Sequence, residues 1–533
     1  MSKRWQLPEP APESFRQTFP EMNRTLLRLL WNRGLREKEA IDTFLAPDWD
    51  RDSFDPALFK NMKAAVARTF AALEAGEVIT VHGDYDADGV CGSAVLISTL
   101  RELCRAFSFD EKTITSFIPD REKDGYGMSP ATVEHLHLHE KTRLIITVDC
   151  GISNKPAIDR GKELGIDTIV CDHHTMPAEL PESAILIHPL VPGETYPSKT
   201  LCGTGVAFKM ACGLIEEARQ RASNGAPAAA IPSSLLRPSG FAPGDGSPVL
   251  RPHSAPNAFV EGYEKWLLDL VAIATVTDVM PLTGENRALE SFGLKVLNKT
   301  KRVGLKKLIE VAGGTLGALD TYTIGFQIGP RINAAGRMRH ASAALNVLLE
   351  EDPLRAEVLV GELNDANIDR QKASEAMYKE AVAQVGDPGE QKLVVAVGDG
   401  WPAGLVGLER ALAGRELVPT LRTDGEIPLG DANWELVDAM AKLAPFGEGN
   451  PKPAFVTTGL TVSGVATMGA DGKHLRLTVT SPDGKMAKMV GFGFGEWAQK
   501  LRLGNRFDAA YEVGVNEWNG NKELQLRIVD LRV

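Results

Sequence analysis

Long apolar runs and paired cysteines are both missing from this chain of 533 residues. No run of 18 or more apolar residues occurs, so the sequence predicts no membrane-spanning helix. The six cysteines are scattered and none stands in a CxxC pair, which argues against a disulfide scaffold and against a zinc ribbon. The first residues show no apolar signal segment. We therefore expect reduced thiols in a cytoplasmic protein.

An excess of positive charge is also missing. The chain has 59 Lys and Arg residues against 70 Asp and Glu residues, a formal net charge of −11. This balance argues against nucleic-acid binding by bulk charge alone, but local basic patches and bound metals leave a nucleic-acid substrate open. No Walker A loop occurs, so motor chemistry driven by nucleotide hydrolysis is not indicated.

The length suggests about three domains. Between about residues 70 and 220, short apolar runs rich in β-branched residues alternate with helical patterns. Continuous runs of this kind are typical of strands that are buried on both faces of a parallel sheet. The pattern predicts a doubly wound α/β domain with strands at residues 78–81, 113–118, 144–148 and 168–170.

Changes in composition and in hydrophobic periodicity divide the chain further. Five strand candidates in its last 90 or so residues predict a small barrel of the OB type, at residues 454–462, 475–480, 486–492, 507–515 and 524–529. We expect a helical segment at 1–70 and the α/β core at 71–300, with a flexible insertion rich in proline at 222–258. A helical connector follows at 301–390, with a long helix at 352–384. A short second α/β lobe at 391–440 opens with a strand at 393–397, and the OB-like domain occupies 441–533.

The strongest functional motif is HGDYDADG at residues 82–89. It follows the strand 78–81 directly, and open α/β sheets place their sites at the carboxyl ends of strands. Asp84, Asp86 and Asp88 would repel one another unless a cation neutralised them, and carboxylate oxygens favour Mg²⁺ or Mn²⁺. An acidic turn that caps a helix is the alternative interpretation. An EF-hand is excluded because no Glu stands at the last loop position.

Three further motifs end in polar residues of the same kind. Asp149 follows the strand 144–148, Asp172-His173-His174 follows the strand 168–170, and Asp278 follows an apolar run. Each motif alone also fits a helix cap or an incidental histidine. Together they supply carboxylates and imidazoles without a thiolate pair, which fits a two-metal site for phosphoryl hydrolysis.

The sequence resembles the DHH phosphoesterase family, and within it the exonucleases specific for single strands. The family takes its name from the motif that stands here as Asp172-His173-His174. The resemblance rests on HGDYDADG (82–89), IPDREKDGYGMS (118–129), VDCGIS (148–153), CDHH (171–174), TDVMPLTGENR (277–287), GPRINAAGRM (329–338), LAPFGEGNP (443–451), GKHLRL (472–477) and VNEWNGNKELQL (515–526).

This resemblance implies a metal-dependent hydrolase of the EC 3.1 class that degrades single-stranded DNA from 5′ to 3′ into 5′-mononucleotides, in DNA repair and recombination. It implies Mn²⁺ or Mg²⁺ at the cleft of a nuclease core that is followed by an OB domain. A single-strand-binding protein and a helicase are the partners it suggests, and we expect a monomer. Two alternatives stay open: a DHH phosphoesterase for small substrates such as oligonucleotides, cyclic dinucleotides or pyrophosphate, and a weakened or inactive relative that only binds single strands.

The resemblance also assigns roles to residues. It implies the metal ligands Asp84, Asp86, Asp88, Asp149, His173, His174 and Asp278, among which Asp149 and His174 also act in catalysis together with Arg331. It implies substrate contacts at His82, Arg121, Arg331 and Asn333. For Arg331, an ion pair between domains is the alternative. Trp518, in a polar turn, and Phe492 or Phe494 offer stacking surfaces for bases on the barrel, with core packing as the alternative.

The sequence departs from the family after the core. The family carries a DHH-associated domain with a Gly-Gly-His stretch, which helps to hold the strand and its terminal phosphate. Here Pro402 stands where a His is usual, and no Gly-Gly-His occurs. We expect that half or more of this domain is missing, which puts recognition of the 5′ end in doubt and leaves the metal site intact.

Overall fold

The computed structural model describes residues 3–121, 123–223, 262–385, 420–469, 471–518 and 521–533, together with residues 239–241, 248–249 and 398. The expected strand at 393–397 lies outside these residues, as does most of the insertion at 222–258. Within that insertion, two short strands are described, β7 (Ser239–Phe241) and β8 (Pro248–Val249), which pair antiparallel. The division into five segments stays a prediction.

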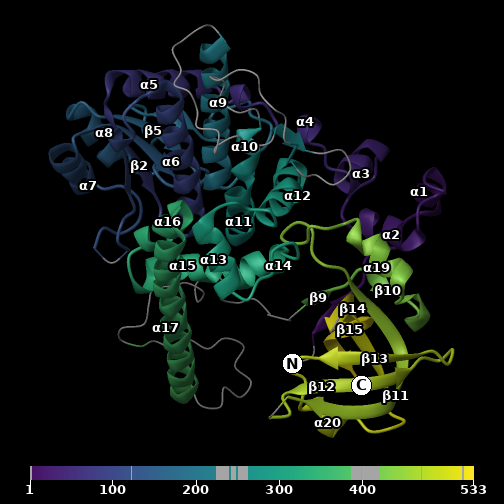
Figure 1. The fold of residues 1–533 in the computed structure, drawn as a ribbon. Coiled ribbons are helices and arrows are strands. Elements are labelled where there is room, and N and C mark those ends of the chain that lie inside the picture. Colours follow the sequence, from purple (N-terminus) through teal and green to yellow (C-terminus); the bar gives the residue numbers. More distant parts are fainter. Residues whose placement is uncertain are drawn as a thin grey trace.

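A five-stranded parallel sheet forms the centre of the larger lobe (Figure 1). The strand order is β3-β2-β4-β5-β6, so the chain moves to one side of β2 and then returns to its other side. The four strands that the sequence predicts are confirmed within one or two residues at each end. The bounds are β2 (Val78–Gly83), β3 (Ile114–Phe117), β4 (Thr142–Val148), β5 (Asp167–Cys171) and β6 (Ile185–Ile187).

Helices cover both faces of this sheet, which makes it doubly wound. Leu144 and Ile146 of β4 pack into the larger hydrophobic core, while Ile145 between them packs into a separate one. Successive side chains of a strand point to opposite faces, and here both faces are apolar. The first face is covered by α5 (Met62–Ala75), α6 (Ala87–Phe107) and α9 (Gly203–Ser223), and the second by α7 (Pro130–His135) and α8 (Lys155–Glu163).

A helical layer continues the larger lobe. It contains α10 (Tyr263–Trp266), α11 (Leu268–Thr277), α12 (Gly284–Leu297), α13 (Val303–Val311), α14 (Thr321–Thr323), a π-helical turn at Ile324–Ile328, α15 (Gly329–Met338) and α16 (Ser342–Leu349). The long helix expected at 352–384 is α17 (Pro353–Val385), and it projects away from the lobe in Figure 1. Among the described residues, none of the helices combines the length and the apolar character needed to cross a membrane.

The second lobe contains the expected OB-like barrel. Its strands are β11 (Ala454–Met468), β12 (His474–Thr480), β13 (Met486–Gly491), β14 (Arg506–Trp518) and β15 (Asn521–Arg532), and pairing of β11 with β14 closes the barrel. In β12, Leu475, Leu477 and Val479 are buried and alternate with more exposed residues. This period of two is the pattern that predicts the strands from the sequence.

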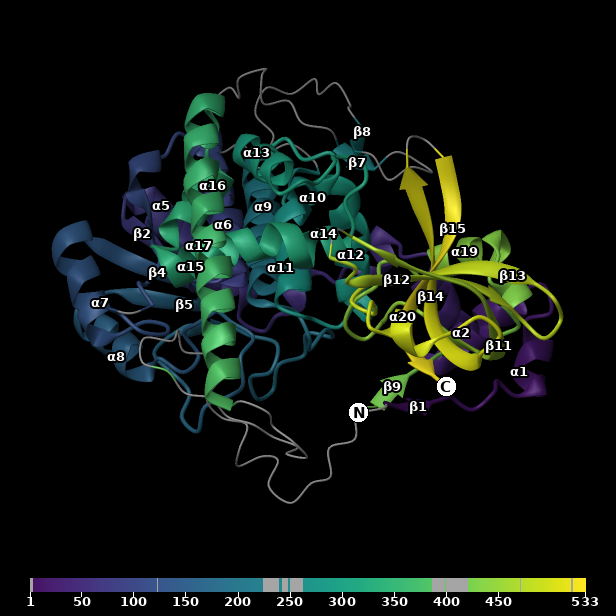
Figure 2. The ribbon, with the colours of Figure 1, turned by 90° about the horizontal axis from the view of Figure 1, so that it is seen from below.

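The N-terminal helices pack on this barrel and not on the sheet that follows them in sequence. Residues of α1 (Glu13–Thr18), α2 (Arg24–Asn32) and α3 (Lys38–Leu45) share one hydrophobic core with the barrel and with α19 (Trp434–Ala441). The strand β1 (Arg4–Gln6) pairs in parallel with β9 (Thr420–Arg422). The indole N–H of Trp5 donates to Asp530 at 2.6 Å, so the two ends of the chain lie side by side (Figure 2).

A buried arginine joins the two lobes. Arg287 of α12 is 2% exposed, and its guanidinium donates to the carbonyl oxygens of Phe44 at 2.6 Å, Ala444 at 2.9 Å and Pro445 at 3.5 Å. Burial, and to a lesser degree the charge of Arg33, lowers the pKa of Arg287 to about 10. One side chain of the larger lobe therefore holds two segments of the barrel lobe.

We predict that Arg287→Ala destabilises the protein. The substitution leaves the carbonyl oxygens of Phe44 and Ala444 without this donor, whereas that of Pro445 still accepts from Asn450. We expect this loss to lower the free energy of unfolding by about 3 kcal/mol. Urea denaturation of the two proteins measures this difference. The matched control is Arg16→Ala, because the ion pair of Arg16 within the described residues is with the exposed Glu13 at 3.4 Å. Equal stability of the Arg287 and Arg16 variants would contradict the role of Arg287 as the joint.

Candidate metal centre

The polar motifs of the sequence meet at one edge of the sheet. The first motif follows β2, Asp149 follows β4, and Asp172-His173-His174 follows β5, and these three strands are neighbours. The chain changes direction between β2 and β4, and open α/β sheets bind their ligands at such a switch point, beyond the carboxyl ends of the strands. Asp278 reaches the same place from the end of α11.

The first motif is folded tightly against α6. The carboxylate of Asp86 accepts from the backbone N–H groups of Asp88 at 2.9 Å and Gly89 at 3.1 Å, and so caps this helix. A Cβ atom at Gly89 would lie 2.5 Å from the backbone nitrogen of Asp84, so only glycine allows the loop to close. The side chain of Asn333, on α15, accepts from the N–H of Ala87 at 2.7 Å and fixes the start of the helix from the other side.

Asp88 links the first motif to the helix α9. Its carboxylate oxygens accept from the backbone N–H of Gly203 at 2.7 Å and of Thr204 at 2.8 Å. The first N–H groups of a helix carry a partial positive charge, which stabilises a carboxylate there. Asp88 is 1% exposed, so this contact offsets part of the cost of burying its charge.

Asp149 has a strained backbone. Its φ angle is +61°, in the left-handed region that residues other than glycine rarely adopt. A Cβ atom at Gly203 would lie 2.5 Å from the Cβ of Asp149, so glycine at this position lets the helix α9 approach. Strain of this kind persists where the surrounding structure enforces it, and such residues cluster at functional sites.

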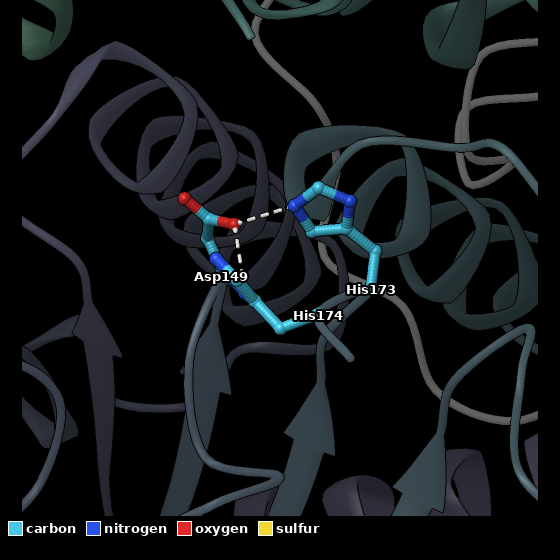
Figure 3. Close-up of side chains that lie close together, drawn as sticks. All are labelled: Asp149, His173 and His174. Carbon is cyan, nitrogen blue, oxygen red and sulfur yellow. Dashed lines mark ion pairs between the residues drawn. The ribbon is translucent and has the colours of Figure 1, made fainter. Parts of the chain in front are cut away.

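The side chains of these motifs converge, and Figure 3 shows Asp149 together with His173 and His174. The Nε2 atom of His173 lies 3.1 Å from a carboxylate oxygen of Asp149, 3.5 Å from one of Asp278 and 3.7 Å from one of Asp88. The ligand atoms form three sets, and within each set they lie within 4.8 Å of one another. The sets are Asp84, Asp86 and Asp149; Asp88, His173 and Asp278; and Asp149, His173 and His174. The structure thus brings together all seven residues for which the sequence predicts metal binding.

The residues at this site fit divalent cations. Several buried ligand atoms have no hydrogen-bond partner among the described residues, namely one carboxylate oxygen each of Asp84, Asp149 and Asp278 and the Nε2 of His173. Burial and the charge of Asp86 raise the pKa of Asp84 to about 7, and burial and the charge of Asp88 raise that of Asp278 to about 8. Burial and four neighbouring aspartates also raise the pKa of Asp149. Burial and mutual repulsion outweigh the charge of His174 at Asp84 and Asp278, and two shared cations would supply the positive charge that these carboxylates still need.

Asp172, the first residue of the DHH motif, orients the two histidines. One of its oxygens accepts from the N–H of His173 at 2.7 Å and contacts Nδ1 of His174 at 2.8 Å, and the other accepts from the N–H of Ile152 at 3.0 Å. Burial opposes its ionisation, but these hydrogen bonds prevail and lower the pKa of Asp172 to about 2. The bond to Asp172 in turn raises the pKa of His174.

The residues proposed for substrate binding lie in different surroundings. His82 is fully buried, with its ring stacked on Phe117, and burial lowers its pKa to about 4. Arg121 is exposed, with its guanidinium 5.1 Å from the ring of Tyr85. Arg331 donates to Asn364 at 3.1 Å, and its hydrogen-bond acceptors within the described residues are neutral oxygen atoms. The side chain of Trp518 lies outside the described part of the chain. These roles stay predictions.

Two residues of the site are missing from the ligand and substrate sets that the sequence suggests. One is Asp172. The other is Tyr126, whose hydroxyl lies 3.2 Å from Nε2 of His174 and 3.3 Å from the carbonyl oxygen of Asp149. Tyr126 stands between Gly125 and Gly127, both with positive φ, in the segment GYG. A tyrosine framed by two glycines is the pattern that would have pointed to it.

Comparison with known proteins agrees with this geometry. The DHH family, N-terminal domain, matches residues 78–234, and the RecJ OB domain matches residues 423–530. The single-stranded-DNA-specific exonuclease RecJ of Bacillus subtilis is 31% identical over 611 residues, which cover 99% of this chain and 71% of the relative. This chain belongs to the RecJ family. The matched region is longer than the chain, so the Bacillus RecJ has residues inside it that this chain lacks.

Solved RecJ structures have the same fold. RecJ of Thermus thermophilus in complex with Mn²⁺ superposes with a TM-score of 0.74 at 26% identity, covering 99% of this chain and 79% of that one. The same protein in complex with Mg²⁺ gives a TM-score of 0.69 at 25% identity, covering 99% and 78%. The resemblance to the DHH family and the expected architecture of an α/β core with an OB-like barrel are therefore confirmed.

We predict that the metal-free protein loses stability as the pH rises from about 4 to about 8. Unfolded aspartates ionise near their ordinary pKa of 3.8, whereas folded Asp84 and Asp278 keep their protons to about pH 7 and 8. The folded state therefore binds more protons over this range, and its free energy of unfolding falls as the pH rises.

His82 and His188 act in the opposite direction, because burial lowers the pKa of each to about 4. A comparison with Asp278→Asn isolates one carboxyl from these groups. We expect the variant to lose less stability than the wild type between about pH 5 and pH 8, in urea denaturation with EDTA present. An identical pH dependence of the two proteins would contradict the raised pKa of Asp278.

Proposed function

We propose that this chain is a metal-dependent exonuclease that hydrolyses single-stranded DNA from 5′ to 3′ and releases 5′-mononucleotides. The observation that carries the proposal is the set of seven convergent ligand residues at the sheet edge of a RecJ-family fold. The cations we propose are Mn²⁺ or Mg²⁺, the ions named for the Thermus RecJ structures.

We infer the following division of work among the residues. Asp84, Asp86, Asp88, Asp149, His173 and Asp278 hold the cations, and His174, the seventh residue of the set, acts on the phosphate. Bound divalent cations supply the activation of water and offset the negative charge that develops on the phosphate. Asp149 belongs to two of the three ligand sets, which suits a carboxylate shared between two ions.

His174 is the residue of this set that is suited to touch the substrate. Its side chain is 43% exposed, against 12% for His173. Asp172 holds its Nδ1, and the raised pKa favours the protonated ring, which donates hydrogen bonds to phosphate oxygens. Tyr126 keeps the ring in place from the other side at 3.2 Å. We propose that His174 stabilises charge on the scissile phosphate in this way.

The barrel supports a polymeric substrate. Phe492 is 50% exposed, with the ring of His474 at 5.3 Å and the guanidinium of Arg527 at 5.8 Å. An exposed aromatic ring among basic side chains suits stacked bases and their phosphates. A phosphoesterase for small substrates has no use for such a face, so we favour single-stranded DNA.

We further propose that the chain works as a monomer, because a single chain supplies every residue of the candidate metal centre. A single-strand-binding protein and a helicase as loading partners remain part of the proposal, as do the cytoplasmic location and the role in repair. Binding of the purified chain to each of these partners would test them separately from hydrolysis.

We predict that Asp149→Ala abolishes the hydrolysis of a long single strand that carries a 5′-phosphate and a 3′ label. Loss of a residue that merely supports a metal ligand costs about 10-fold to 100-fold in activity, so we expect loss of this shared ligand to cost at least 100-fold. The measurement is the shortening of the labelled strand with Mn²⁺ present, resolved on a sequencing gel.

The matched control is Asp159→Ala, which removes a surface carboxylate of α8 that pairs with Lys155. It should shorten the strand at the wild-type rate. A strand with a blocked 5′ end should stay intact with every protein. Hydrolysis by the Asp149 variant at the rate of the control would overturn the assignment of the site, and shortening of the blocked strand would overturn the polarity.

A further inference from the structure

Two exposed aromatic rings lie on the larger lobe where it approaches the barrel. Tyr322 of α14 is 56% exposed and Phe326 of the following π-helical turn is 70% exposed, and their rings stack with centroids 4.7 Å apart and planes at 28°. Ile324 and Ile328 of the same turn are fully buried. The turn thus buries its aliphatic residues and leaves the aromatic pair in solvent.

The contacts of this turn place it between the candidate metal centre and the barrel. On one side, a Cβ atom at Gly329 would lie 2.3 Å from the side chain of Thr277, the residue before Asp278. On the other side, the hydroxyl of Thr321 donates to the carbonyl oxygen of Phe446, in the loop that leads into the barrel, at 2.6 Å. Figures 1 and 2 both show α14 on the side of the larger lobe that faces the barrel.

Arg331, on α15, follows the aromatic pair along the chain, and its guanidinium contacts the backbone of the same turn. The guanidinium of Arg331 donates to the carbonyl oxygen of Gln327, next to Phe326, at 2.7 Å. A second nitrogen of Arg331 lies 3.5 Å from the carbonyl oxygen of Val311, whose side chain is itself 43% exposed. Exposed aromatic faces hold unpaired bases by stacking, and basic side chains along the same path bind the phosphates between them.

We propose that Tyr322 and Phe326 form a platform on which unpaired bases of the DNA strand stack as it runs from the candidate metal centre to the barrel. This proposal rests on the proposed function. Nucleobases are the proposed occupant because the segment that carries the rings contacts Thr277, beside the candidate ligand Asp278, and the loop before the barrel. Stacking is tolerant of sequence, since every base has an aromatic face. The platform therefore holds the strand without reading its sequence.

The test is the steady-state hydrolysis of a long 5′-phosphorylated single strand by the full chain with Mn²⁺. We expect Phe326→Ala to raise KM about tenfold and to leave kcat within about twofold of the wild type, because the rings bind the strand away from the reacting phosphate. Phe326→Trp should restore KM, whereas Phe326→Leu, which keeps apolar volume without a ring, should not. Tyr378→Ala is the matched control, since Tyr378 of α17 is 71% exposed and far along the chain from the turn.

A second readout reports stacking directly. A hydrolysis-resistant phosphorothioate strand with 2-aminopurine at one internal position should lose fluorescence on binding to the wild type and to Tyr378→Ala, and lose less on binding to Phe326→Ala. An unchanged KM together with unchanged quenching in Phe326→Ala would overturn the platform, and so would a loss confined to kcat. No hydrolysis by the wild type would instead overturn the proposed function, so the two failures are distinguishable.

Discussion

Repulsion among buried carboxylates is the constraint around which the larger lobe is built. Asp84, Asp86, Asp88 and Asp149 are crowded at the ends of β2 and β4, and three of these four are under 4% exposed. The protein offsets part of their charge with backbone N–H groups at the starts of α6 and α9. The raised pKa values of Asp84 and Asp149 show that this compensation is incomplete. Divalent cations at this site would supply the positive charge that the backbone N–H groups do not.

The same elements that hold this site connect it to the barrel. The segment after Asp278 leads into α12, where Arg287 binds the carbonyl oxygens of Phe44 and Ala444. The N–H of Leu282 in this segment also donates to the carbonyl oxygen of Glu448 at 2.8 Å. Leu282 lies four residues after the candidate ligand Asp278. A DNA strand that binds the barrel is therefore bound by a lobe that directly contacts the segment next to the metal centre. This arrangement suits an enzyme that hydrolyses the end of a long polymer.

Local pattern was enough to predict much of the fold and of the candidate site. The β-branched runs in the sequence predict where β2, β4 and β5 lie. Because neighbouring parallel strands end at the same edge of a sheet, the runs also predict that Asp149 and His173 lie close together. Other features depend on contacts between distant segments. The four leucines of α2 form an apolar stripe, which predicts that another part of the protein covers this helix but not that the barrel does. The contact of Tyr126 with His174 depends on how a loop with two left-handed glycines folds back, which no periodicity reveals.

The most direct test of the account is the number of Mn²⁺ ions that one chain binds. We expect titration of the metal-free protein to give two ions per chain, with an electron paramagnetic resonance spectrum that shows two coupled ions, because Asp149 belongs to more than one ligand set. Asp149→Ala should lose the coupling. A single uncoupled ion in the wild type, or a coupled pair that survives in the variant, would contradict the shared two-metal centre.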